Sequence, residues 1–214
     1  MSTHNFLSIA KKASQEAGIP GTGLASVESA TGTNLLLVKW CIDAWLDIQL
    51  MHHARWRFMQ KDASFSTMDA KATYNSTEFG ATDIATVLNN ELEIDDGRVI
   101  KVVDENEWRA LALHRSTATG APTHVLLTNA NPMQFDPVPD AIYNITYRYE
   151  RMPQIIALNA DELICPERFA KAVEYAAAVS YAEYQEDNDK VFRLSKKYET
   201  WLGKLEKDQL PSLK

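Results

Sequence analysis

The sequence has few of the residues that build covalent frameworks. Only two of its 214 residues are cysteines, Cys41 and Cys165, and no Cys-x-x-Cys pair occurs. Small disulfide scaffolds are dense in cysteine, and zinc ribbons need closely spaced cysteine pairs, so both classes are excluded. We predict two free, buried thiols. The sequence does not give their separation in space, so a disulfide between them stays an open alternative.

Long hydrophobic runs are also missing. No stretch approaches the roughly 20 apolar residues that a membrane-spanning helix needs. Near the N-terminus the basic pair Lys11-Lys12 follows the apolar residues, whereas a signal peptide has its basic residues first. The sequence therefore predicts no membrane span, no secretory leader and no membrane partner, and we expect the protein to stay in the compartment where it is made.

Sequence motifs for phosphate binding and nucleophilic catalysis are absent. Neither Gly-Lys-Ser/Thr nor Gly-x-Ser-x-Gly occurs. Gly18, Gly21 and Gly23 follow a predicted helix, whereas a dinucleotide-binding loop follows a strand. We interpret these glycines as a helix stop and a loop.

The histidines do not have the spacing of metal ligands. His52 and His53 are adjacent, and adjacent side chains on a helix point in different directions. A helical zinc pair is spaced i, i+4, and His4, His114 and His124 are scattered along the chain. The sequence predicts no metal site.

Four carboxylates gather at Glu91, Glu93, Asp95 and Asp96. Two carboxylates in a cleft could hydrolyse a glycosidic bond. Glu91 and Glu93, however, share one face of an alternating segment that runs into a turn, which favours a solvated strand edge. We therefore predict no enzyme, no catalytic residues and no cofactor.

The net charge of −7 is unevenly distributed. Residues 1–189 carry 26 acidic and 15 basic side chains, whereas residues 190–214 carry 3 acidic and 7 basic ones. An acidic body repels nucleic acid, so DNA is a poor candidate for specific binding. The basic C-terminal end could instead contact an acidic protein surface.

Apolar residues recur at helical spacing in four segments, which predict helices over 3–17, 34–53, 166–186 and 190–208. Thr3 is a candidate cap for the first helix, and Pro166 suits the first turn of the third. In the second helix we expect Trp40 and Trp45 to be core residues.

The middle of the chain has the period-two alternation of strands. Asp95-Asp96-Gly97 predicts a hairpin turn, and residues 141–151 alternate apolar with polar side chains. We predict an α+β fold, a mainly helical four-helix bundle with a β-rich insertion between helices 2 and 3. The expected parts are the bundle (1–54 and 160–208), the insertion (55–159) and a C-terminal tail (209–214).

Several segments occur in an order and spacing typical of one protein family. They are 16–23, 38–49, Trp56-Arg57-Phe58, Pro137-Val138-Pro139, the strand ending Tyr147-Arg148-Tyr149, Pro166-Glu167-Arg168-Phe169, and Tyr198, Leu202, Leu205 and Asp208-Gln209-Leu210-Pro211. Through them the chain resembles the head-to-tail adaptor, or connector, family of short-tailed bacteriophages over about residues 5–211. The stretch 69–90 departs from the family pattern.

The resemblance implies a structural virion protein located in the neck, with assembly in the host cytoplasm. Such adaptors form a ring, typically a dodecamer, beneath the portal protein, where they close the DNA-filled head and dock the tail or nozzle proteins. Phage DNA would pass through the ring without specific binding. The alternatives are a virion-associated cell-wall hydrolase, and a tail-completion or stopper protein of a longer-tailed phage.

The C-terminal end is the predicted contact with the portal. Its lysines supply positive charge, and the residues after the expected helix stop have no periodic pattern, as expected of a segment held by a partner or left frayed. The predicted contact residues are Lys204, Lys207, Gln209, Leu210, Pro211 and Leu213.

Overall fold

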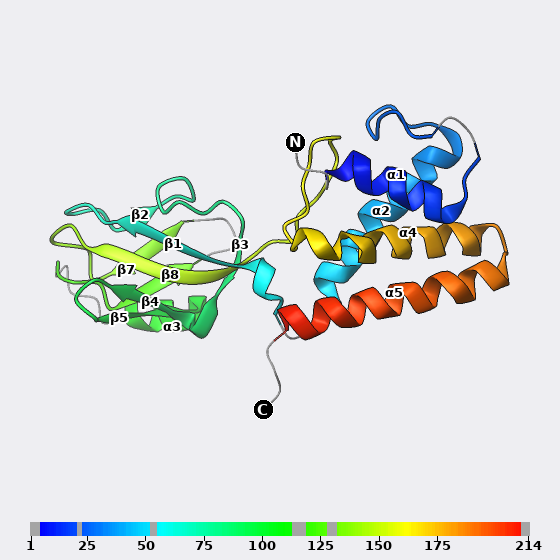
Figure 1. Cartoon of the computed structure of the whole chain (residues 1–214). Helices are drawn as coiled ribbons and strands as arrows, with labels where there is room; N and C mark the ends of the chain where they lie inside the picture. The colour runs from blue at the N-terminus through cyan, green and yellow to red at the C-terminus, as the bar shows by residue number, and fades with distance from the viewer. Residues whose placement is uncertain (1–4, 21–22, 52–54, 113–118, 128–131, 211–214) are drawn as a thin grey trace. The chain divides into compact units, whose positions relative to one another are not determined.

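The computed structural model describes residues 5–20, 23–51, 55–112, 119–127 and 132–210. The chain divides into two compact units. The first, called here the helical unit, comprises residues 1–59 and 153–214, and the second, the sheet unit, comprises residues 60–152 (Figure 1).

The helical unit contains α1 (Phe6–Ala17), α2 (Gly32–Leu50), α4 (Ala170–Tyr184) and α5 (Asn188–Gln209). Local chemistry defines the helix ends. Asn5 caps α1 by accepting a hydrogen bond from the Ser8 backbone N–H at 3.0 Å, and Gly18 ends it with φ 68°, a left-handed conformation that favours glycine. The Asp187 side chain caps α5 by accepting from the Lys190 backbone N–H at 3.0 Å.

Helix α4 is the central element of this unit, because α1, α2 and α5 all pack on it (Figure 1). Its buried side is rich in alanine, which lets neighbouring helices approach closely. The first two helices thus share a core with the last two. The alanines are Ala170, Ala172, Ala177, Ala178 and Ala182.

Aromatic side chains form a stack in the core of the helical unit. Phe58 lies between Trp45 and Trp56, with ring centroids at 5.8 and 5.4 Å. The Trp56 indole N–H donates to the Ile48 carbonyl at 2.8 Å. Trp45 is completely buried, which confirms it as a core residue, whereas Trp40 is half-buried against Tyr181 and Tyr184.

The sheet unit is an eight-stranded mixed sheet in the described residues. The strand order is β1-β8-β4-β5-β6-β7-β2, and β3 also pairs with β8. All pairings are antiparallel except β5 with β6, which α3 connects (Glu105–Ala112). The strands are β1 (Gln60–Ser66), β2 (Thr73–Tyr74), β3 (Ile84–Val87), β4 (Glu91–Ile94), β5 (Val99–Val103), β6 (His124–Leu127), β7 (Met133–Asp136) and β8 (Asn144–Arg151).

Strand alternation gives the sheet its own core. In β8, Ile145, Tyr147 and Tyr149 are buried, whereas Thr146 and Arg148 are exposed. Alternation of this kind in β4, β7 and β8 produces one apolar face. The core cluster contains Phe65, Tyr74, Phe79, Ala81, Ile84, Val87, Leu92, Ile94, Ile100, Val125, Met133, Phe135, Ile145, Tyr147 and Tyr149.

The predicted fold class, a mainly helical four-helix bundle with a β-rich insertion, is wrong. The described residues contain five helices and an eight-stranded sheet with a hydrophobic core of its own. Helical periodicity over long segments dominates the sequence pattern, whereas most strands here are four residues or shorter and give weak signals singly. Strand β3 was not predicted. The residue that caps α1 is Asn5, and the predicted cap, Thr3, lies outside the described residues.

Candidate functional site

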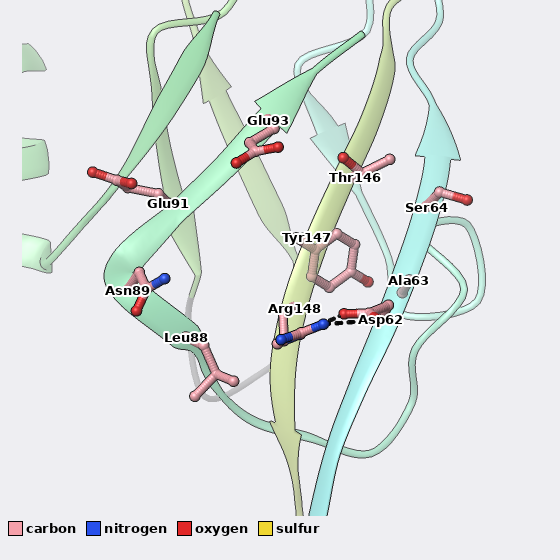
Figure 2. A pocket seen from close by; sticks show the side chains of 10 residues that line it. All are labelled: Asp62, Ala63, Ser64, Leu88, Asn89, Glu91, Glu93, Thr146, Tyr147 and Arg148. Carbon is pink, nitrogen blue, oxygen red and sulfur yellow. Dashed lines mark hydrogen bonds and ion pairs between the residues drawn. The ribbon is translucent and has the colours of Figure 1, made fainter. Parts of the chain in front are cut away.

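A groove of about 630 Å³ lies on the solvent-facing side of the sheet. It is formed by β1, β8 and β4 together with the helical turn Leu88–Asn90 (Figure 2). We call it the sheet groove. Its lining residues are Asp62, Ala63, Ser64, Leu88, Asn89, Glu91, Glu93, Thr146, Tyr147 and Arg148.

The sheet groove arises where the partner strand of β8 is interrupted. β3 pairs with β8 up to Val87 opposite Tyr149, and β4 resumes the pairing at Glu93 opposite Thr146. Between them Asn89 and Asn90 take left-handed φ values of 62° and 55°. Asparagine tolerates this conformation better than most residues, so the chain can turn away from β8 there and return.

An ion pair crosses the floor of the sheet groove. The Arg148 guanidinium donates to both carboxylate oxygens of Asp62, at 2.6 and 3.2 Å, from directly opposite positions on β8 and β1 (Figure 2). The hydrogen bond from Arg148 lowers the pKa of the Asp62 carboxyl. Asp62 therefore stays ionised at neutral pH and balances Arg148.

Glu91 and Glu93 supply the remaining charge. Both glutamates are exposed, whereas the alternate residues Leu92 and Ile94 are buried. The prediction that Glu91 and Glu93 share one face of the strand is therefore confirmed. The predicted strand edge is wrong, because β4 lies inside the sheet between β8 and β5. With Asp62 and Arg148, the groove carries three negative charges and one positive charge.

The sheet groove suits a charged contact better than hydrolysis. A glycosidase needs one carboxyl kept protonated by its surroundings beside a second, ionised carboxylate. Here Asp62 is held ionised by Arg148, and Glu91 and Glu93 are both exposed. Among the described residues no group of three or more potential ligands could hold a metal ion.

A second hollow, of about 480 Å³, lies along the outer surface of α5. We call it the α5 groove. Leu194 and Leu205 form the buried side of the same helix. This surface was not predicted, although an aromatic residue close to Lys190 and Arg193 in a charged helix was a possible signal. The lining residues are Phe192, Arg193, Lys196, Lys197, Thr200 and Trp201.

The predicted portal-contact residues lie at the end of α5, which extends to Gln209. Lys204 and Lys207 are exposed, and the Lys204 ammonium lies 4.1 Å from the centre of the Trp201 ring. Leu210 is half-buried against the helical core. Pro211 and Leu213 lie outside the described residues.

The cysteines are buried in the helical core. Burial raises the pKa of both thiols, Cys41 and Cys165, to about 12. The thiolate is the reactive form, so neither side chain is suited to nucleophilic chemistry.

The other predicted groups also have local explanations. Gly18 ends α1, and Gly23 has φ 83°, whereas Gly21 lies outside the described residues. His124 is half-buried, with Nδ1 2.9 Å from the Thr123 hydroxyl. The remaining histidines, His4, His52, His53 and His114, lie outside the described residues.

Comparison with known families matches residues 5–212 to the SU10 adaptor protein. The chain belongs to the SU10 adaptor protein family. The match covers both the helical unit and the sheet unit, including residues 69–90, where the resemblance was weakest. A search of curated proteins found no match.

Family membership makes the chain a structural adaptor protein of a bacteriophage and a component of the virion. Adaptors of this kind interact with portal and tail proteins in general, and the family supports a structural rather than an enzymatic role. No helix among the described residues is long and apolar enough to cross a membrane.

Proposed function

We propose that this adaptor assembles as a ring, a dodecamer, beneath the portal protein in the neck of the particle. There it closes the DNA-filled head and docks the tail or nozzle proteins. The observation that carries this proposal is the family match over residues 5–212, which includes both the helical unit and the sheet unit. The excess of acidic residues in the sheet unit supports a ring through which DNA passes without specific binding.

The C-terminal end is the proposed contact with the portal. Lys204 and Lys207 are exposed cations in the last turns of α5, where Asp208 is paired with Arg168. Leu210 anchors the helix end on the core. The chain beyond Leu210, with Pro211 and Leu213, would then continue onto the portal. Contacts made by exposed lysines weaken as salt rises, because ions screen them.

Native mass spectrometry of the portal ring mixed with this protein tests the proposal. We expect mass increments of 24.1 kDa that end at one copy per portal subunit. Truncation after Leu210 should abolish binding, whereas exchanging Lys11 on α1 for alanine should leave it unchanged. Full binding by the truncated protein would move the portal contact away from the C-terminal end, and no binding by the wild type would contradict the adaptor position itself.

A further inference from the structure

The α5 groove combines positive charge with an exposed aromatic side chain. Phe192, Lys196 and Thr200 follow one another at i, i+4 spacing, and Arg193, Lys197 and Trp201 form the adjacent row. Phe192 is 73% exposed, the largest exposure of any aromatic side chain among the described residues. A large apolar side chain held in water beside cations is typical of a contact surface.

The three cations of the α5 groove differ in how freely they can contact a partner. Lys197 pairs with Glu16 at 3.0 Å and lies 5.0 Å from the centre of the Tyr175 ring, so it is held toward α1 and α4. Arg193 and Lys196 are both exposed, and Arg193 donates to the Asp189 carbonyl in its own helix. The charge offered to a partner therefore centres on Arg193 and Lys196, which line the α5 groove together with Phe192.

The opposite charge is concentrated in the other unit of the same chain. Residues 60–152 hold 14 acidic and 8 basic side chains, a balance of −6 out of the total of −7. Within it, the sheet groove carries Asp62, Glu91 and Glu93 against Arg148. Half-buried Ala63 and Leu88 in the same groove offer apolar surface beside the carboxylates.

We propose that the α5 groove of one copy docks on the sheet groove of a second copy. This inference rests on the proposed ring and names the contact that would build it. Arg193 and Lys196 would face Glu91 and Glu93, and Phe192 would cover Leu88. Two different surfaces of one chain that bind each other make a heterologous contact, which is the kind that closes into rings.

Charge complementarity favours a copy of this chain over nucleic acid as the occupant. A DNA-binding surface neutralises many phosphates with a broad array of cations. Here one of the three cations is already paired with Glu16, exposed Glu199 lies beside the lysines, and the most exposed residue is apolar Phe192. These features match a small protein contact of mixed charged and apolar character.

Zero-length cross-linking of lysines to carboxylates tests the contact directly. Equal amounts of ¹⁴N- and ¹⁵N-labelled protein are mixed at high concentration, cross-linked with a carbodiimide and digested. We expect mixed-isotope peptides that join Lys196 to Glu91 or Glu93. The proposal would be overturned if these residues were cross-linked only within chains of the same isotope, because the contact would then lie within one chain. It would also be overturned if the mixed-isotope cross-links joined only other surfaces.

Charge reversal provides an independent test. The α5 variant Arg193→Glu/Lys196→Glu and the sheet variant Glu91→Lys/Glu93→Lys should each weaken self-association, measured by sedimentation, by at least about tenfold. Combining all four changes in one chain should restore association. The matched controls Lys11→Glu on α1 and Glu105→Lys on α3, both at exposed positions, should leave association as in the wild type. Circular dichroism shows that each variant folds.

The outcomes separate this contact from the adaptor role. If both single-surface variants lost self-association and the combined variant did not regain it, the proposed pairing of the two grooves would be rejected. It would also be rejected if the wild-type protein did not self-associate, either alone or on the portal ring. Binding of duplex DNA that Arg193→Glu/Lys196→Glu abolishes, with self-association unchanged, would assign the α5 groove to nucleic acid instead. Portal binding that survives in either case would leave the proposed function standing.

Discussion

At the scale of single residues, the helical core depends on a few large side chains. Trp45 has no exposed surface and stacks on Phe58, which also stacks on Trp56. The three residues come from α2 and from the segment just before β1, so the stack holds that segment on the helices of its own unit. Removing one ring leaves a cavity that its neighbours cannot fill without moving.

Replacement of Trp45 by alanine should lower the free energy of unfolding by about 3–5 kcal/mol, because burial is lost and a cavity opens. Urea denaturation measures the change. The neighbouring variant Leu46→Ala is the control, since Leu46 is 37% exposed and should cost much less. An unchanged midpoint for Trp45→Ala would show that its placement in the core is wrong.

A buried carboxylate makes the stability of the helical unit depend on pH. Glu174 on α4 is only 3% exposed, and burial raises the pKa of its carboxyl, although Lys12 at 3.7 Å opposes the shift. The folded state therefore favours the protonated form. This contribution is fully present below the unfolded pKa and is lost as pH rises through the folded pKa.

The substitution Glu174→Gln removes that dependence. We expect it to raise the melting temperature by a few degrees at pH 8, where folding of the wild type must either bury the carboxylate or protonate it, and by less at pH 4, where the raised pKa favours the neutral acid. Glu183→Gln, at an exposed position of the same helix, should show neither effect. A destabilised Glu174→Gln at pH 8 would mean that the pair with Lys12 outweighs the cost of burial.

Sequence reasoning predicts a buried tryptophan more readily than a buried charge. Trp45 falls on the apolar stripe of a helix, so its position follows from spacing. Glu174 also lies on the buried side of α4, although a glutamate on a helix is usually solvated. Its burial follows from the packing of α1 and α2 on α4, which the local sequence does not show.

At the scale of elements, short turns decide the architecture of the sheet unit. The predicted hairpin at Asp95-Asp96-Gly97 is confirmed, since β4 and β5 pair on either side of it. β3 was missed because Ile84–Val87 gives a strand of four residues, and its pairing with β8 depends on a distant partner. The sheet groove was missed for the same reason: Asp62, Arg148 and Glu93 meet only through strand pairing.

Two glycines provide a matched test of backbone conformation. Gly97 has φ 85° in the hairpin, whereas Gly203 lies within α5, and an added Cβ at either position would meet nothing within 4 Å. Gly97→Ala should therefore cost about 1 kcal/mol or more through backbone strain alone. Gly203→Ala should instead stabilise by roughly 0.5–1 kcal/mol, because alanine favours helix.

Thermal or urea unfolding of both glycine variants gives the comparison. If Gly97→Ala proved as stable as the wild type, the left-handed backbone conformation of Gly97 between β4 and β5 would be incorrect. If Gly203→Ala lost stability, α5 would not continue through that position.

At the scale of the whole molecule, the chain consists of two bodies with different charge. The sheet unit is a single continuous segment with its own hydrophobic core, whereas the helical unit needs both ends of the chain. The prediction of a mainly helical bundle was wrong because it treated the eight-stranded sheet as an insertion. Strand pairing over long sequence distances cannot be predicted from local periodicity. The helical positions were predictable because helix periodicity is local.

The fragment 60–152 should fold alone, since its strands pair with one another and bury their own apolar face. We expect a β-type circular dichroism spectrum and a cooperative thermal transition. The fragment 1–59 is the contrasting control: α1 and α2 would lose α4, on which they pack, and should not form a stable core. A fragment 60–152 without a cooperative transition would mean that the sheet needs the helical unit.

The most direct test of the adaptor role is a cryo-electron microscopy reconstruction of the neck of the phage particle. We predict a ring of density immediately beneath the portal into which the helical unit and the sheet unit each fit, with one copy per portal subunit. Density for this chain in the head shell or the distal tail, or its absence from purified particles, would contradict the account.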